Sequence, residues 1–352
     1  MTQIDKTKPV LVTGATGYVA GWLVKRLLEE GITVHAAVRD PHNENKTAHL
    51  NDLVEKTPGT IKYFKSDLLV EGSYAEAMHG CELVYHTASP FTSDFEDPQK
   101  ELIDPAVEGT QNVLETAKKV ASVKRVVVTS SCAAIYTDAI EAEQAPEGKL
   151  TEEMWNTSAS LDYQPYSYSK VLAEKKAWEI AESQSQWDLV TINPSLVLGP
   201  PLNPQSVTSE SFALLKQFGD GSLKMGAPKV GIGLVDVRDV AEAHYQAGFN
   251  PKAQGRYITS AHDTNFLELG HSLMPKYGED YPLPQKALPK WLLMLIGPMV
   301  DDRFSRRFIR DNVNRTWRAD NSKIKEELDI QFRPMQETME ASFGVLVEQD
   351  MI

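Results

Sequence analysis

The sequence contains few cysteines, no surplus of positive charge and no long apolar run, and each absence excludes a class of protein. Only Cys81 and Cys132 are present among 352 residues, which excludes a disulfide framework and a Cys-x-x-Cys metal or redox pair. No stretch approaches the ~20 apolar residues of a membrane span, and residues 1–8 lack an apolar signal core. We therefore expect a cytoplasmic protein with no membrane partner and no metal site. The longest apolar run, residues 288–300, is interrupted by prolines and a lysine, and we expect a buried or lid helix there.

The charge balance is acidic. Lys and Arg number 36 against 49 Asp and Glu, which gives a formal net charge of -13. Nucleic acids and anionic membranes need a surplus of cations, so a broad surface for either is excluded and any anion site must be local. Apolar residues make up 41% and charged residues 24%, an ordinary globular balance. We expect one or two domains in a monomer or homodimer.

The first two thirds of the chain alternates short β-branched runs with helical patterns, which is typical of a parallel sheet with crossover helices. Strands are predicted at residues 10–13, 33–38, 61–65, 83–87, 125–130 and 189–193. Helices are predicted at residues 18–30, 48–56, 74–78, 101–120 and 166–183, and Pro105 should start or kink the fourth. The pattern predicts an α/β fold with a Rossmann-type doubly wound parallel sheet.

The alternation of strand and helix patterns ends after residue 193, where four prolines fall within residues 194–204. We expect a smaller, mostly C-terminal substrate-binding region formed by residues 194–228 with 262–352. Residues 229–235, 238–248 and 255–259 have the pattern of a strand, a helix and a strand that return to the main sheet. The dinucleotide-binding domain is therefore predicted to comprise residues 1–193 with 229–261.

A glycine-rich turn joins the first predicted strand to the first helix. Glycines in this setting let backbone amides approach a pyrophosphate, and the helix amino end favours its negative charge. The alternative is a tight turn with no ligand, but the strand, turn and helix context favours a dinucleotide. The predicted contacts are Thr13, Gly14, Thr16, Gly17, Tyr18 and Val19, with Ala20 as the small third position.

The end of the second predicted strand discriminates between NAD and NADP. An acidic residue there binds a free ribose hydroxyl, whereas a cation accepts a 2′-phosphate. Arg39 comes first and Asp40 second, so NADP is favoured, with Lys46 as a second phosphate contact. The alternatives are that Asp40 turns toward the ribose, or that Arg39 is a solvated surface residue.

Further cofactor contacts are predicted after the next strands. Asp67 and Leu68 follow the third strand, where the aspartate either holds the adenine amino group or caps a turn. Thr87, Ala88 and Ser89 follow the fourth strand with small side chains, as a backbone close to a cofactor requires; a plain loop is the alternative.

A tyrosine and a lysine stand four residues apart, at Tyr166 and Lys170, at the start of a predicted helix. This spacing places both side chains on one helix face, and the cation is expected to lower the pKa of the phenol. The pair would then serve as a general acid near neutral pH. The predicted strand at 125–130 ends in Thr129, Ser130 and Ser131, and only one of the two serines can point into the site from a regular strand.

In order along the chain, these segments resemble the extended short-chain dehydrogenases/reductases, and within them the dihydroflavonol 4-reductase group, which also holds cinnamoyl-CoA reductases and microbial ketone and aldehyde reductases. The resemblance spans nearly the whole chain. It rests on residues 12–19, 37–41, 129–131, 169–174, 193–200 and 235–241.

This resemblance implies an NADPH-dependent enzyme in which Ser131, Tyr166 and Lys170 are catalytic. Lys170 would hold the nicotinamide ribose, and Tyr166 would give a proton to the carbonyl oxygen. The resemblance also implies that Thr129 and Pro194, Ser195, Leu196 and Val197 contact the cofactor. Asn112 falls where the superfamily often has an asparagine with a helix-stabilising or proton-relay role.

The expected substrate is a small molecule with a bulky apolar or aromatic aldehyde or ketone group. Tyr136 replaces the asparagine common in dihydroflavonol reductases, and residues 164–168 depart from the cinnamoyl-CoA reductase pattern, so neither dedicated role is indicated. The candidate pocket residues, each of which is as readily a core residue, are Phe91, Tyr136, Trp155 and Phe212. The alternatives are an NAD-dependent sugar-nucleotide epimerase or dehydratase, a hydroxysteroid dehydrogenase and a non-catalytic dinucleotide sensor.

Overall fold

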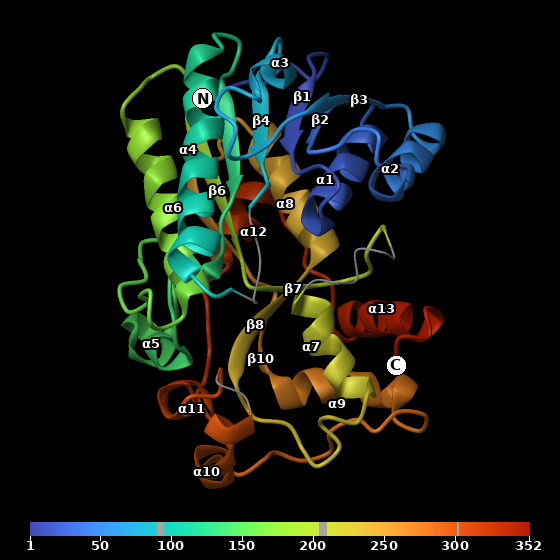
Figure 1. The fold of residues 1–352 in the computed structure, drawn as a ribbon, viewed down its shortest axis with the longest axis vertical. Helices are drawn as coiled ribbons and strands as arrows, with labels where there is room; N and C mark the ends of the chain where they lie inside the picture. The colour runs from blue at the N-terminus through green and yellow to red at the C-terminus, as the bar shows by residue number, and fades with distance from the viewer. Residues whose placement is uncertain (90–94, 204–209, 301–302) are drawn as a thin grey trace.

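The computed structural model describes residues 1–89, 95–203, 210–300 and 303–352. A half built on a large sheet and a half built on a small sheet are stacked along the long axis of the molecule (Figure 1). Among the described residues, no helix is both long and apolar enough to cross a bilayer.

The large sheet has seven parallel strands in the order β3-β2-β1-β4-β5-β6-β9. This order reverses direction between β1 and β4, which is where open α/β sheets form a ligand crevice at their carboxyl edge. The predicted Rossmann-type sheet is confirmed. Its strands are β1 (Val10–Thr13), β2 (Thr33–Val38), β3 (Thr60–Lys65), β4 (Leu83–His86), β5 (Arg125–Thr129), β6 (Asp188–Pro194) and β9 (Gly255–Thr259).

Helices cover both faces of this sheet because its strands are apolar on both sides. In β1, Val10 and Val12 pack toward one helix layer and Leu11 toward the other. The first layer contains α1 (Tyr18–Glu29), α2 (Glu44–Lys56), α8 (Val237–Phe249) and α12 (Ser322–Leu328), and the second contains α3 (Ala75–Met78), α4 (Asp104–Lys119) and α6 (Pro165–Glu182).

The predicted helix over residues 101–120 is divided in two. A π-helical turn, Gln99–Ile103, precedes α4, and Pro105 lies in the first turn of α4. Proline is tolerated there because its missing N–H would have no partner within the helix. Pro105 therefore starts the helix rather than kinking it.

The small half contains a three-stranded sheet in the order β10-β8-β7. Its strands are β7 (Leu196–Leu198), β8 (Gly231–Asp236) and β10 (His262–Asn265). The expectation that residues 229–235 return to the main sheet is therefore wrong, since β8 pairs with β7 and β10. Residues 255–259 do join the main sheet, as β9. The division of the chain into two domains stays a prediction.

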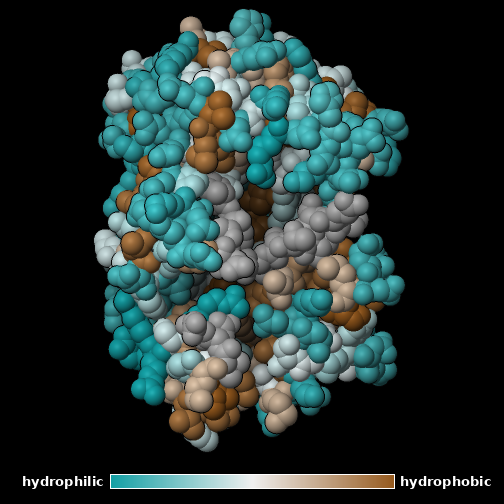
Figure 2. Space-filling model, in the orientation of Figure 1, coloured by the Kyte–Doolittle hydropathy of each residue, from teal (hydrophilic) through white to brown (hydrophobic). Residues whose placement is uncertain are grey.

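Several helices surround the small sheet. They are α7 (Glu210–Gly219), α9 (Phe266–Tyr277), α10 (Lys290–Val300), α11 (Arg306–Asn312) and α13 (Met335–Glu348), and the short α5 (Ala139–Gln144) contacts α11. Of the two alternatives for residues 288–300, a buried helix or a lid helix, the buried one is contradicted by α10. Its Trp291 and Leu295 are 70% and 62% exposed, and apolar surface is visible at this end of the molecule (Figure 2).

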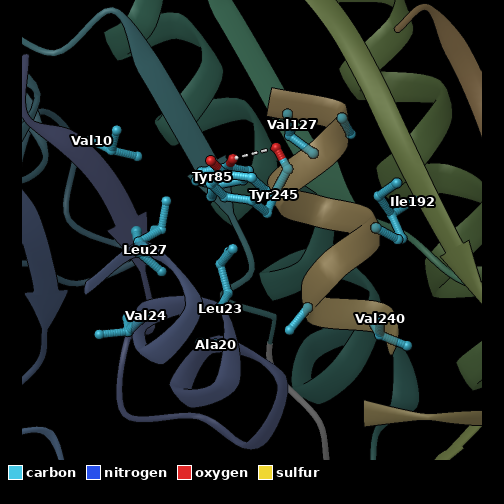
Figure 3. Close-up of a cluster of buried hydrophobic side chains, with 14 of the residues drawn as sticks. Val10, Ala20, Leu23, Val24, Leu27, Tyr85, Val127, Ile192, Val240 and Tyr245 are labelled. Carbon is cyan, nitrogen blue, oxygen red and sulfur yellow. Dashed lines mark hydrogen bonds between the residues drawn. The ribbon is translucent and has the colours of Figure 1, made fainter. Parts of the chain in front are cut away.

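One close contact fixes α8 on the main sheet. Tyr85 of β4 is fully buried, and its hydroxyl donates to the carbonyl oxygen of Tyr245 at 3.5 Å (Figure 3). A Cβ on Gly248, one turn further along α8, would lie 2.0 Å from the Tyr85 hydroxyl oxygen. Only glycine leaves room for the tyrosine at this point.

We predict that Gly248→Ala lowers the free energy of unfolding by about 1–3 kcal/mol, because the added methyl group overpacks the core against Tyr85. Urea denaturation measures the loss. Gln246→Ala, on a less buried position of the same helix, is the control. Equal stability of the two variants would contradict the packing argument.

Candidate active site

The glycine-rich turn after β1 brings its backbone close to the end of β4. Gly14 has φ +61°, a left-handed conformation, and its N–H donates to the carbonyl oxygen of Ala37 at 3.0 Å. A Cβ on Gly14 would lie 3.0 Å from the Cβ of Ala88. Gly17 is the N-cap residue of α1. The turn thus places backbone without a side chain between the ends of β1 and β4, beside the amino end of α1.

Thr13 supports this turn through hydrogen bonds to the segment that follows β4. It is fully buried, and its hydroxyl oxygen accepts hydrogen bonds from the N–H groups of Thr87 and Ala88 at 3.1 and 3.0 Å. The Thr87 hydroxyl in turn donates to the Thr13 carbonyl oxygen at 2.5 Å. Thr13 therefore positions the predicted cofactor contacts at 87–89 relative to the glycine turn.

The structure brings Ser131, Tyr166 and Lys170 together at the carboxyl edge of the sheet. The Ser131 hydroxyl lies close enough to the Tyr166 phenol to oppose the rise in its pKa that burial causes. The Lys170 Nζ donates to the Ser89 Oγ at 2.9 Å and lies 5.5 Å from the centre of the Tyr166 ring. Residues that follow β4 and β5 therefore meet residues of α6 at this edge.

The two strand-end serines have different environments. Ser131 faces Tyr166, whereas the Ser130 hydroxyl donates to the Glu174 Oε2 at 2.5 Å. Thr129 lies before them, and its Oγ1 is 2.6 Å from the Nε2 of His244. Alternation along the strand end thus directs one serine to the site and the other to a buried carboxylate.

Burial moves the pKa values of the tyrosine and the lysine in opposite directions. It raises the pKa of Tyr166 to about 12, and the hydrogen bond from Ser131 opposes this rise. It lowers the pKa of Lys170 to about 8. The expectation that Lys170 lowers the pKa of the phenol is therefore wrong for the structure without cofactor, because desolvation of the phenolate dominates. Tyr166 holds its proton at neutral pH and is a hydrogen-bond donor.

Residues 10–258 match the NAD dependent epimerase/dehydratase family. The chain belongs to this family. It is 41% identical over 281 residues to "Cinnamoyl-CoA reductase CAD2" of Medicago truncatula, covering 79% of this chain and 83% of the relative. It is 36% identical over 286 residues, 80% of each chain, to "Bifunctional dihydroflavonol 4-reductase/flavanone 4-reductase" of Malus domestica.

Among solved structures, the yeast methylglyoxal/isovaleraldehyde reductase Gre2 complexed with NADPH superimposes with a TM-score of 0.75 at 27% identity, covering 98% of this chain and 100% of that one. The resemblance to extended short-chain dehydrogenases/reductases of the dihydroflavonol 4-reductase group is confirmed. The family binds NAD(P), and the relatives compared are reductases.

Three features of the site fit a bound NAD(P). The backbone of Gly14 leaves a cradle that a side chain would fill. Ser195 follows the end of β6, and its Oγ is buried with no hydrogen-bond partner among the described residues. Lys170 places a buried amine beside Ser89. On the face shown in Figure 2, a hollow lies between the half with the large sheet and the half with the small one.

The ends of β2 and β3 carry the predicted adenosine contacts. Arg39 and Lys46 are exposed, and the Asp40 Oδ1 accepts a hydrogen bond from the N–H of His42 at 3.0 Å. Asp67 likewise caps a turn, since its Oδ1 accepts from the N–H of Leu69 at 2.9 Å. Both aspartates therefore stabilise local turns.

Asn112 has a structural role in the loop after β3. Its Nδ2 donates to the carbonyl oxygens of Leu68 and Val70, each at 2.9 Å, and its Oδ1 accepts from the N–H of Gly72 at 3.1 Å. These three bonds hold the segment that carries Leu68. Of the two roles open for this asparagine, the contacts match the structural one.

The candidate substrate residues that the structure describes each pack against a different partner. Phe91 lies outside the described residues. Tyr136 packs against Trp317 with ring centres 5.6 Å apart, and Trp155 lies 4.0 Å beneath the guanidinium of Arg256. Phe212 is 1% exposed and packs edge-on against Tyr18 in the core of the small half, which matches the core alternative.

Sequence reasoning missed the buried ion pair between Arg256 and Glu174, whose Nε and Oε1 lie 2.6 Å apart. The position of Glu174, one helical turn after Lys170, could have indicated that its side chain lies near the site. Its partner Arg256 comes from a distant strand and could not be inferred in this way. Among the residues that the structure describes, no group of three or more His, Cys, Asp or Glu side chains is placed to hold a metal.

Burying Lys170 destabilises the cofactor-free protein, and the size of this cost depends on pH. Below pH 8 the amine is protonated in both the folded and unfolded states, so the full cost is present. Between pH 8 and its ordinary pKa of 10.5, the unfolded chain binds a proton that the folded protein has released, so the cost shrinks as pH rises.

We predict that Lys170→Met raises the free energy of unfolding of the cofactor-free protein by about 1–3 kcal/mol at pH 7, with the gain fading toward pH 10.5. Turnover should be lost at the same time. Chemical denaturation at a series of pH values measures the gain. Lys175→Met, on the exposed face of α6, should show no such pH-dependent gain, and a Lys170→Met protein less stable than the parent at pH 7 would refute the prediction.

Proposed function

We propose that this protein is an NADPH-dependent reductase of aldehyde or ketone carbonyls, with bulky apolar or aromatic substrates. The observation that supports this most directly is that Ser131, Tyr166 and Lys170 lie together at the carboxyl edge of the large sheet. Two hydroxyl groups there can bind one carbonyl oxygen from the same side. The solved Gre2 structure similar to this chain is itself named as a methylglyoxal/isovaleraldehyde reductase.

Each residue of the proposed site has its own role in the reduction. When bound, NADPH supplies the hydride that reduces the carbonyl carbon. Ser131 and Tyr166 donate hydrogen bonds to the carbonyl oxygen and stabilise the charge that develops on it. Tyr166 keeps its proton at neutral pH and transfers it to that oxygen, which completes the alcohol. Lys170, with its pKa lowered to about 8, is largely protonated at pH 7 and holds the cofactor ribose.

We predict that Tyr166→Phe lowers kcat by about 10²–10⁴-fold, because the proton donor is lost while the aromatic ring remains. The dissociation constant for NADPH should change little. The assay follows NADPH absorbance against a panel of aromatic aldehydes, ketones, β-keto esters and flavonoids.

Tyr168→Phe, on the same helix without a lysine four residues on, is the control and should keep parental turnover. No NADPH consumption by the parent protein across the panel would refute the proposed function. An active, folded Tyr166→Phe protein would remove Tyr166 from its role.

The preference for NADPH is proposed from the end of β2. Arg39 is exposed there, and Lys46 lies in the first turn of α2. The Asp40 carboxylate is engaged by the N–H of His42, which leaves the guanidinium as the better placed partner for a 2′-phosphate. The solved Gre2 structure is an NADPH complex.

We predict that Arg39→Ser lowers kcat/KM with NADPH by about ten- to a hundredfold, because charge-assisted hydrogen bonds to the 2′-phosphate are lost. The value with NADH should change little. Lys62→Ser, on the neighbouring strand β3 away from its carboxyl end, is the control. A parent enzyme that prefers NADH would contradict the assignment.

A further inference from the structure

A buried carboxylate lies directly behind the catalytic residues. Glu174 is 2% exposed and stands one turn after Lys170 on α6. Its Oε2 accepts hydrogen bonds from the Ser130 Oγ at 2.5 Å and the Asn193 Nδ2 at 2.8 Å. Its Oε1 accepts from the Arg256 Nε at 2.6 Å. One side chain thus joins α6 to β5, β6 and β9.

Three of these elements, α6, β5 and β6, carry or directly precede residues of the proposed site. Ser130 immediately precedes Ser131, and Asn193 also donates to the carbonyl oxygen of Ser131 at 3.2 Å. Asn193 in turn precedes residues 194–197, the proposed nicotinamide contacts. The Glu174 carboxylate therefore binds the side chains of residues next to two parts of the site, while its own helix carries Tyr166 and Lys170.

Arg256 supplies the positive charge that a buried carboxylate requires. It is 7% exposed, and its Nη1 donates to the carbonyl oxygens of Glu152 and Met154 at 2.8 and 2.5 Å. Its guanidinium also stacks on the ring of Trp155 at 4.0 Å. The arginine thus ties the 152–155 segment to the same carboxylate.

We propose that Glu174, held by Arg256, is a positioning residue that sets the Ser131 hydroxyl relative to Tyr166 and Lys170. The hydrogen bond from Ser130 to Glu174 fixes the strand end, so that the next residue, Ser131, faces the phenol. The hydrogen bond from Asn193 to Glu174 fixes the neighbouring strand end in the same way. This inference rests on the proposed function, because its consequence for turnover requires the hydroxyl groups to act on a carbonyl.

The chain contains a second arginine–carboxylate pair on the same two strands, away from the site, whose acid, Asp188, is more exposed than Glu174. Arg125 begins β5 and Asp188 begins β6, so this pair clamps the same two strands at their amino ends. Arg125 is 1% exposed, and its Nε and Nη2 donate to the two Asp188 oxygens at 2.7 and 3.0 Å. A purely structural role for Glu174 predicts that neutralising either acid lowers stability, more at the buried Glu174, but leaves kcat of the folded protein unchanged.

The experiment compares Glu174→Gln with Asp188→Asn at a temperature where both proteins are folded. We expect Glu174→Gln to lower kcat about 100-fold, the effect of misplacing a catalytic group by about 1 Å, with the NADPH dissociation constant nearly unchanged. Asp188→Asn should keep parental kcat. Ser130→Ala removes one hydrogen bond to Glu174 and provides a milder variant if Glu174→Gln does not fold; its kcat should fall in the same direction.

Hydrogen exchange provides a readout that needs no turnover. Peptides covering residues 129–135 and 165–174 should exchange faster in Glu174→Gln than in the parent and should be unchanged in Asp188→Asn. Equal kcat losses in the two variants, or unchanged exchange in both peptides with Glu174→Gln, would overturn the positioning role. Absence of turnover in the parent protein would instead refute the proposed function, and the exchange data would still decide the role of Glu174.

Discussion

The parallel direction of β1, β4, β5 and β6 is the constraint on which the whole site depends. Because all four strands run the same way, their carboxyl ends meet at one edge, and the glycine turn, Ser89, Ser131 and residues 194–197 are neighbours although they are far apart in sequence. The reversal of strand order between β1 and β4 opens that edge for a ligand. Helix α6 then needs only to pass this edge with its amino end for Tyr166 and Lys170 to complete the cluster. A different strand direction would separate every one of these groups.

The sequence predicted local features well because each has a short-range cause. Apolar β-branched runs predicted the strands of the main sheet, and the spacing of Tyr166 and Lys170 predicted their shared helix face. The partner of β8 was not predictable in this way, because a strand pattern carries no information about which sheet it joins. The prediction for Phe212 has the same limitation, because an aromatic residue on an amphipathic helix suits a pocket and a core equally. Only its packing against Tyr18 in the structure places it in the core. Arg256 and Glu174 were missed because a buried ion pair depends on residues 82 positions apart.

Burial explains the electrostatics of the site better than the proximity of charges does. The same desolvation raises the pKa of Tyr166 to about 12 and lowers that of Lys170 to about 8. Both shifts favour neutral forms, so the phenol keeps the proton that a general acid must give. The site therefore holds an amine that destabilises the fold when charged, next to a donor that the fold keeps protonated. Buried polar groups of this kind persist where they serve function, and here they lie beside fully paired groups such as Glu174.

The glycine turn is also tied directly to the small half of the molecule. The Tyr18 hydroxyl, in the first turn of α1, donates to the carbonyl oxygen of Gly199 at 2.6 Å, and the Trp22 Nε1 donates to that of Pro200 at 2.8 Å. Gly199 in turn donates its N–H to the Ser342 Oγ of α13 at 2.7 Å. Hydrogen bonds thus run from the residues proposed to hold the pyrophosphate, through the chain that follows β7, into the helices around the small sheet. Because these bonds are at least partly shielded from solvent, they fix the position of the glycine turn relative to the half proposed to hold the substrate.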